Sequence, residues 1–185
     1  MKRLFIGIAA CLLLFTACRR AEEKRTATAA GQHPVADDRA PYYPGLIEEY
    51  RTILAEDPDN LAATIALGNA YLESGAWPDA IRQYEQALER DPRNADVRTD
   101  LGTAYRNSGM PERALAEYRL ALKYEPGHLN ARYAIGMVYG FDLRNYGLAI
   151  HVWEELLRLA PNYPRADSMR SSMALFRNTL AKEHP

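Results

Sequence analysis

The chain has 185 residues, of which 48% are hydrophobic and 25% are charged, so its composition excludes a wholly disordered protein. Its 23 basic and 24 acidic residues leave a net charge of −1, which argues against a general nucleic-acid binder. The only two cysteines, Cys11 and Cys18, lie near the start, and this excludes a disulfide framework and a cysteine metal cluster.

Residues 1–17 have the pattern of a secretory signal peptide. Two basic residues precede an uncharged run over residues 4–17, which as a helix would span about 21 Å and fall short of the roughly 30 Å core of a bilayer. The run ends in Phe15-Thr16-Ala17-Cys18, which resembles the lipobox of bacterial lipoproteins. This resemblance implies that Cys18 is acylated and anchors the chain to a membrane on its periplasmic face, and Arg19 favours the outer membrane.

Three alternatives to this lipidation site stay open. Ile8-Ala9-Ala10-Cys11 is a second match to the lipobox, although cleavage before Cys11 would leave few apolar residues in the signal peptide. Ordinary cleavage beside Ala17 and an uncleaved anchor are the others. Residues 18–44 are rich in charged and small residues that could not bury against a core, so we expect a flexible tether after Cys18.

Residues 61–163 contain a repeat with a period of 34. Segments 61–94 and 95–128 are identical at eleven of 34 positions, and a third copy over residues 129–163 carries one inserted residue. Gly68 and Gly102 stand at equivalent places, and so do Tyr84 and Tyr118. We expect two antiparallel helices in each copy, because the glycine lets the second helix approach and the tyrosine fills the gap between them.

This pattern resembles the tetratricopeptide repeat in its period, in the order of its residues and in their types. It departs from the family at the opening tryptophan, which is replaced by Thr64, Arg98 and Arg132. The resemblance implies an all-α fold, a right-handed α-solenoid whose three repeats are residues 61–94, 95–128 and 129–163. Within these repeats we expect Gly75 and Gly109 to end the first helices in the left-handed conformation, and Asn94 to cap the helix that follows it.

Each end of such a stack needs a closing element, because a repeat exposes apolar side chains to its neighbour. Leu46, Tyr50 and Ile53 have the spacing of the recurring positions in the second helix of a repeat. This spacing predicts an N-terminal half-repeat over residues 45–60. After Pro164, one apolar stripe surrounded by polar residues predicts a C-terminal capping helix over residues 164–185.

No pattern of catalytic or cofactor-binding residues stands out, and we expect neither an enzyme nor a small-molecule substrate. His151, Glu154 and Glu155 fall on one helix face, but such a group without further ligands is typical of a solvated surface. Asp96 and Asp100 are one helical turn apart, and without a pocket they indicate helix-surface charges rather than an acid–base pair. The sequence therefore predicts no metal, no cofactor and no nucleic-acid partner.

The resemblance also implies a binding surface, because the second, fifth, ninth and twelfth residues of each repeat tend to line the concave side of the family's fold. The residues expected there are Ala62, Ile65, Asn69, Leu72, Asp96, Thr99, Thr103, Arg106, Asn130, Tyr133, Met137 and Gly140, flanked by Glu73 and Asp100. We expect the acidic pair to favour a partner segment with Lys or Arg, and Tyr133 and Met137 to take an apolar side chain. The alternative is that these residues form solvated helix faces only.

Some family members grip the carboxylates of chaperone tails with a Lys/Asn/Arg clamp. Only Asn69 matches that pattern here, so we do not expect a chaperone-tail clamp.

These patterns together predict a membrane-anchored, periplasmic lipoprotein that acts as a protein–protein interaction adaptor or scaffold in envelope assembly. Its partner would be another protein or an extended peptide segment. The order of a half-repeat, three repeats and an amphipathic cap also looks like the periplasmic repeat domain of cytochrome c maturation, which implies binding of an apocytochrome. A third prediction is a structural scaffold that self-associates through residues 45–57. The oligomeric state stays open.

Overall fold

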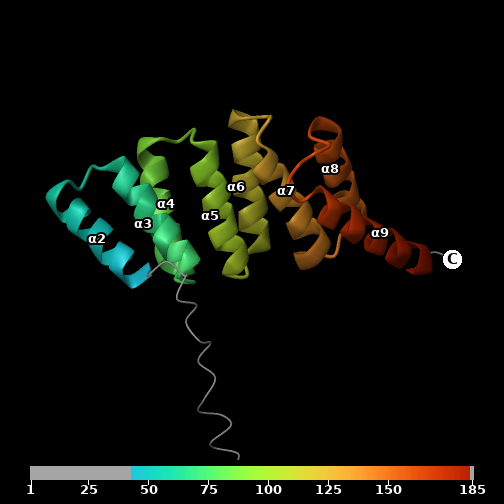
Figure 1. Ribbon diagram of the computed structural model, residues 1–185, viewed down its shortest axis with the longest axis horizontal. Coiled ribbons are helices and arrows are strands. Elements are labelled where there is room, and N and C mark those ends of the chain that lie inside the picture. Colours follow the sequence, from blue (N-terminus) through green and yellow to red (C-terminus); the bar gives the residue numbers. More distant parts are fainter. Residues whose placement is uncertain (1–42, 184–185) are drawn as a thin grey trace, which may run out of the picture. The chain divides into compact units, whose positions relative to one another are not determined.

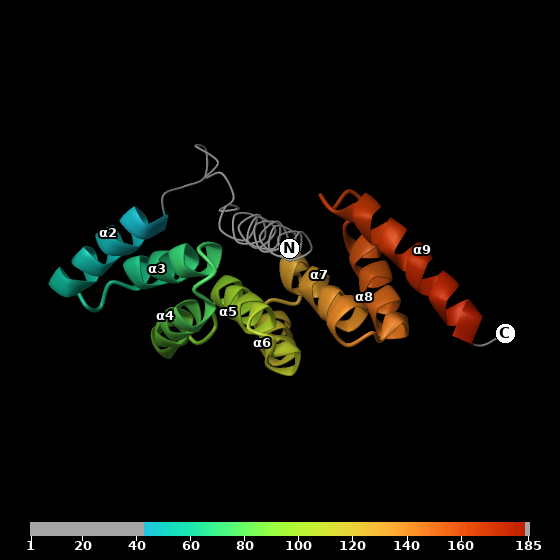
Figure 2. The ribbon, with the colours of Figure 1, turned by 90° about the horizontal axis from the view of Figure 1, so that it is seen from below.

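The computed structural model describes residues 43–183, and all regular structure in that part of the chain is helical (Figure 1). Its eight α-helices are α2 (Tyr43–Glu56), α3 (Leu61–Glu73), α4 (Trp77–Arg90), α5 (Ala95–Asn107), α6 (Pro111–Tyr124), α7 (Leu129–Met137), α8 (Tyr146–Leu159) and α9 (Ala166–Glu183). One π-helical turn, η1 (Val138–Asp142), follows α7. Consecutive helices pack against one another, with α2 and α9 at opposite ends of the row (Figures 1 and 2). The predicted all-α solenoid is confirmed.

The predicted signal peptide, the predicted lipidation site at Cys18 and nearly all of the predicted tether lie outside the described residues. The first described helix, α2, begins at Tyr43, two residues before the expected start of the half-repeat. Pro44 explains the earlier start, since proline suits the first turn of a helix. Within residues 43–183, no helix is both long enough and apolar enough to cross a membrane.

The turns of the repeats have the caps expected at Gly75, Gly109 and Asn94, and Asn60 adds one that was not predicted. The side chains of Asn60 and Asn94 each accept the backbone N–H three residues later, at 3.0 Å, and so begin α3 and α5. Gly75 and Gly109 follow α3 and α5 with φ angles of 80° and 75°, a conformation that glycine adopts without a steric penalty. These turns reverse the chain and make the helices of each repeat antiparallel.

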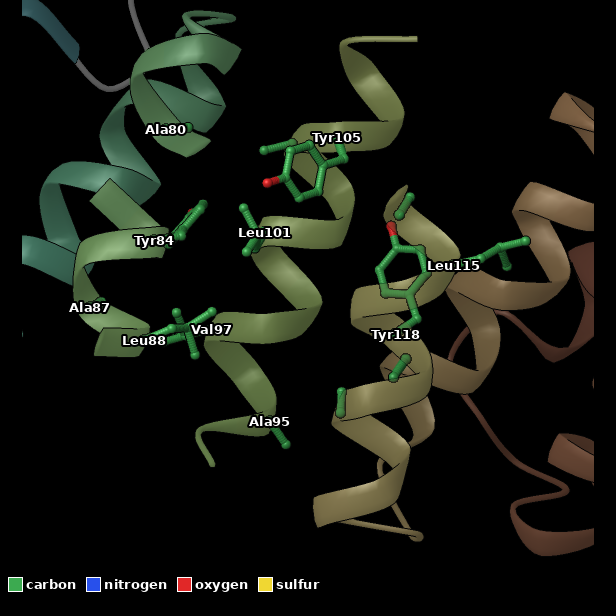
Figure 3. Close-up of a cluster of buried hydrophobic side chains, with 14 of the residues drawn as sticks. Ala80, Tyr84, Ala87, Leu88, Ala95, Val97, Leu101, Tyr105, Leu115 and Tyr118 are labelled. Atoms are coloured by element: carbon green, nitrogen blue, oxygen red, sulfur yellow. The ribbon is translucent and has the colours of Figure 1, made fainter. Parts of the chain in front are cut away.

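The two helices of each repeat approach most closely where a glycine of the first meets an aromatic ring of the second. A Cβ atom added to Gly68 would lie 2.7 Å from the Tyr84 ring, one on Gly102 2.5 Å from Tyr118, and one on Gly136 2.2 Å from Trp153. The three rings are at most 1% exposed, and the two tyrosines appear in Figure 3 among the buried side chains. The expected role of the repeated glycine is confirmed in all three repeats.

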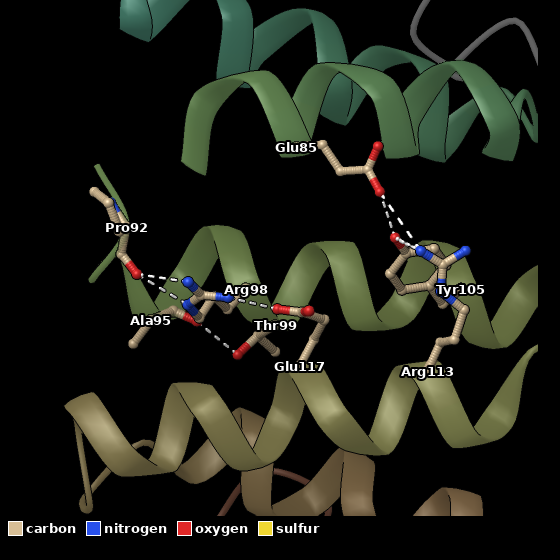
Figure 4. A network of polar contacts seen from close by, with 8 residues as sticks. All are labelled: Glu85, Pro92, Ala95, Arg98, Thr99, Tyr105, Arg113 and Glu117. Atoms are coloured by element: carbon tan, nitrogen blue, oxygen red, sulfur yellow. Dashed lines mark hydrogen bonds and ion pairs between the residues drawn. The ribbon is translucent and has the colours of Figure 1, made fainter. Parts of the chain in front are cut away.

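Arginines occupy the position of the family's opening tryptophan in the second and third repeats. Arg98 donates through Nη1 to Glu117 Oε2 at 2.7 Å, and through Nε and Nη2 to the Pro92 carbonyl (Figure 4). Arg132 donates through Nη1 to Glu155 at 3.2 Å and through Nη2 alone to the Pro126 carbonyl at 3.0 Å. Each arginine therefore joins the two helices of its repeat and also donates a hydrogen bond to a backbone carbonyl in the turn before that repeat.

The inserted residue of the third repeat is accommodated in η1. A π-helical turn holds one residue more than an α-turn, so α8 begins one residue later in its repeat than α4 and α6 do in theirs. As a consequence Gly140, expected on the concave side, lies against the capping helix, where a Cβ atom would come within 2.6 Å of Phe176.

The capping helix α9 buries the predicted stripe. Met169, Met173 and Phe176 are at most 4% exposed and pack with Trp153 in a C-terminal core. The opposite face of α9 is less uniformly polar than expected, because the Leu175 side chain is 61% exposed.

Candidate functional site

A groove of about 510 Å³ opens between α5, α7 and the turn before α9. From here on, "the groove" means the surface formed by Asp96, Thr99, Asp100, Thr103, Arg106, Tyr118, His128, Asn130, Tyr133, Ala134, Met137, Tyr163, Pro164 and Arg165. Of the fourteen residues expected on the binding surface, eight lie here, namely Asp96, Thr99, Asp100, Thr103, Arg106, Asn130, Tyr133 and Met137. A volume of this size suits side chains of a bound segment.

Of the other six, Gly140 lies against α9, and the five that remain belong to α3, toward the N-terminal end of the row. Ile65 and Leu72 are partly buried and pack against the core. Asn69 accepts a hydrogen bond from the Tyr84 hydroxyl at 2.7 Å. Glu73 lies outside the groove, although its charge acts on Asp100.

One wall of the groove is aromatic and tightly held. The Tyr133 ring stacks on Trp153, with centroids 6.0 Å apart, and packs against Tyr163 at 5.7 Å. The Arg165 guanidinium lies 5.0 Å from the Tyr133 ring centre, and Nη1 donates to the Tyr133 hydroxyl at 3.3 Å. Tyr163 in turn donates to Asn130 at 2.9 Å. This packing presents a rigid surface, which loses little side-chain entropy when a partner binds.

The floor of the groove is polar, and its hydroxyl groups form hydrogen bonds with other atoms of the chain. The Thr99 hydroxyl donates to the Ala95 carbonyl at 2.8 Å, and the Thr103 hydroxyl to the Thr99 carbonyl at 3.0 Å. The Tyr118 hydroxyl reaches Thr103 at 3.2 Å, and burial raises the pKa of Tyr118 to about 12. These groups therefore stay neutral at physiological pH.

Asp100 differs from the rest of the floor. Among residues 43–183, no hydrogen bond or ion pair compensates its carboxylate. The pKa of Asp100 is raised from 3.8 to about 6, chiefly by burial and also by the neighbouring carboxylates of Asp96 and Glu73, while His128 lowers it. The centre of the groove thus carries a partly buried negative charge with no direct ion-pair partner among residues 43–183.

His128 has a capping role that the sequence analysis did not foresee. Its Nδ1 accepts the backbone N–H of Ala131 at 3.1 Å, and its Nε2 lies 3.0 Å from Asp96 Oδ1. Since Nδ1 accepts, the ring proton is on Nε2 and is donated to Asp96. The 34-residue period contains the signal for this role, because His128 stands where the first two repeats have the capping residues Asn60 and Asn94.

Other polar residues of interest are committed to ion pairs. Arg106, at the rim of the groove, binds both carboxylate oxygens of Asp142. Glu155 pairs with Arg132, and Glu154 pairs with Arg177. Within the described part of the chain, no three His, Cys, Asp or Glu side chains gather closely enough to hold a metal ion.

Two family models match the repeat region. One describes a TPR repeat and matches residues 68–109, and the other describes a tetratricopeptide repeat and matches residues 99–139. No curated protein matches the chain in sequence.

Several solved structures have the same fold. A crystal structure of MamA superposes with a TM-score of 0.62 at 24% identity, covering 76% of this chain and 88% of the chain in that structure. The first TPR of Spaghetti (RPAP3), bound to the HSP90 peptide SRMEEVD, has a TM-score of 0.60 at 24% identity and covers 68% of this chain and 96% of that one. The Sgt2 TPR domain from Aspergillus fumigatus has a TM-score of 0.60 at 23% identity, with coverages of 68% and 82%.

Proposed function

Because the chain is a tetratricopeptide repeat protein, we propose that it is an adaptor whose groove holds an extended segment of another protein. The observation that carries this proposal is the groove itself, in which an aromatic wall lies beside the Asp100 carboxylate, which has no direct ion-pair partner among residues 43–183. Preformed concave surfaces with a few polar groups are typical of binding sites. A domain of the same fold, that of Spaghetti, has been solved with a bound peptide, which supports an occupant of this size.

The partner of this chain differs chemically from that peptide. The sequence SRMEEVD carries three acidic side chains, and these would face Asp96 and Asp100 in the groove. Like charges at short distance in a partly dehydrated groove disfavour binding. The groove therefore selects against acidic chaperone tails.

The N-terminal sequence supports a lipid anchor at Cys18 and a position on the periplasmic face of a bacterial membrane. Acyl chains contribute about 0.8 kcal/mol per buried CH₂, so two or three chains hold a protein on a membrane durably. An anchored adaptor of this kind recruits its partner to the membrane, and envelope assembly is the process that this position serves.

Labelling with a radioactive fatty acid tests the anchor. The wild-type chain and the matched control Cys11→Ser should both incorporate the label, whereas Cys18→Ser should accumulate as unlabelled precursor. Label that persists in Cys18→Ser, or disappears in Cys11→Ser, contradicts acylation at Cys18.

Affinity capture from an envelope extract tests the groove. Tyr133→Ala with Asp100→Ala should lose the captured partner, while the control pair Tyr124→Ala with Glu112→Ala removes the same kinds of side chain from α6, outside the groove, and should retain it. Circular dichroism must show that both double variants are folded. Full capture by the groove variant would refute the groove as the binding surface.

A further inference from the structure

The three repeats provide an internal comparison for the acidic groups of the groove. Asp100 of the middle repeat stands where the first and third repeats have Ala66 and Ala134. The three positions lie in the same kind of helix within the same packing unit, and alanine serves the fold at two of them. The fold therefore does not require a carboxylate at this position.

The carboxylate of Asp100 is also costly to stability. It is partly buried, and Asp96 and Glu73 repel it. Among residues 43–183, His128 offsets part of this repulsion, but no group forms a direct ion pair or hydrogen bond with the Asp100 carboxylate. A group that lowers stability and is absent from equivalent positions is typical of a functional site, where the cost is offset by a ligand. The group that would neutralise Asp100 is then a cation from outside residues 43–183.

The surroundings of Asp100 define what kind of cation fits. The groove is open to solvent and continues from α5 to Tyr133 and Met137 on α7. A Lys or Arg side chain brings a charged head together with an apolar stem, and the stem can cover the small Ala134 side chain on the way to Asp100. A bare metal ion would need several further oxygen ligands, which Asp100 does not gather around it.

From this arrangement we infer that Asp100 determines specificity by pairing with a Lys or Arg of the bound segment, next to which an apolar side chain packs on Tyr133 and Met137. This inference rests on the proposed function of the groove. Helices α5 and α7 are in contact, and packed helices lie about 10 Å apart, so an extended segment with a rise of about 3.3 Å per residue places the two side chains about three residues apart.

Selection of random short peptides, displayed on phage, against the full chain purified in detergent tests this inference. Peptides selected by the wild-type chain should be enriched in Lys or Arg, with an apolar residue about three positions away. The preference for a basic residue should disappear with Asp100→Ala and should reverse to Asp or Glu with Asp100→Lys. For a single selected peptide, Asp100→Ala should weaken binding about tenfold or more, and Glu112→Ala should leave it unchanged.

The outcomes separate the specificity of Asp100 from the function of the groove. Peptides that lose binding with Tyr133→Ala but show no basic preference would overturn the role of Asp100 and leave the groove as the binding surface. Peptides whose binding is insensitive to both Tyr133→Ala and Asp100→Ala would overturn the two together. A loss of binding with Asp100→Ala caused by unfolding is recognised by circular dichroism, and Asp100→Asn, which keeps the shape and removes the charge, then gives the decisive comparison.

Discussion

The ring of Tyr118 lies directly over Gly102, so that a Cβ atom on this glycine would come within 2.5 Å of Tyr118 Cε1. The same contact joins Gly68 to Tyr84 and Gly136 to Trp153. In each repeat the aromatic ring therefore fills the space that a side chain at the glycine would need. This relationship sets the distance between the two helices and, through it, the position of the first helix beside the groove.

Gly102→Ala should lower the free energy of unfolding by about 1–3 kcal/mol, because the buried Tyr118 ring cannot move aside without repacking. Gly127→Ala is the matched control, since a Cβ atom there meets no atom within 4 Å. Chemical denaturation followed by circular dichroism measures both. Equal stability of the two variants would show that the Gly102 contact is not a tight one.

His128→Ala should destabilise the chain by about 1 kcal/mol, because the backbone N–H at the start of α7 loses its side-chain acceptor. His128→Asn should be close to the wild type, since Asn60 and Asn94 cap the equivalent helices. Thermal denaturation of the two variants gives the comparison. An Asn variant as unstable as the Ala variant would assign His128 a role other than capping.

Asp100→Ala should make the folded chain more stable by about 1–2 kcal/mol at neutral pH, after allowance for solvent screening of a partly exposed group. The folded chain binds this proton more tightly than the unfolded chain, because burial and the carboxylates of Asp96 and Glu73 raise the pKa of Asp100 from 3.8 to about 6. The contribution of Asp100 to stability is therefore greatest below about pH 4 and is lost as the pH rises through about 6.

The advantage of Asp100→Ala over the wild type should accordingly vanish near pH 4 and appear above pH 6. The carboxylates of Asp96 and Glu73 also raise the pKa of Asp100, and His128 lowers it. Tyr84 and Tyr118 stay neutral over this range. Unfolding curves at both pH values test the effect. A destabilised Asp100→Ala variant at neutral pH would mean that the carboxylate has a structural partner.

Arg98→Met should cost about 2–4 kcal/mol, because it leaves Glu117 without its partner in a setting where the two side chains are only 13% and 19% exposed. Arg170→Met breaks the pair with Asp167, whose side chains are 52% and 99% exposed, and should cost less than about 1 kcal/mol. A double-mutant cycle with Glu117→Gln isolates the pairwise coupling. Equal costs at the two sites would contradict the structural role of Arg98 between its helices.

The fold could be predicted from the sequence because the same packing unit occurs in it three times. The period, the glycines and the aromatic residues each constrain the same helix pair, so they reinforce one another. The position of the inserted residue could not be predicted in the same way, since a turn or a helix can accommodate an extra residue. The structure holds it in η1, and this moves Gly140 onto Phe176 and away from the groove.

The groove could be predicted in part. Side chains of α5 and α7 such as Thr103 and Tyr133 could be assigned to the groove from their position within the repeat, because both helices follow the 34-residue period. Tyr163 and Arg165 belong to the turn before α9, which lies beyond the third repeat, and their approach to Tyr133 depends on how the cap folds back. The raised pKa of Asp100 likewise depends on burial, which the sequence pattern does not give.

Site-specific photocrosslinking in living cells tests the central claim that the groove holds the partner. Benzoylphenylalanine replaces Asn130, an exposed residue of the groove, or Glu112, an exposed residue of α6 outside it. The groove position should give a discrete adduct with another protein, and the α6 position should give none. An adduct that forms from Glu112 and not from Asn130 would contradict the claim that this protein binds its partner in the groove.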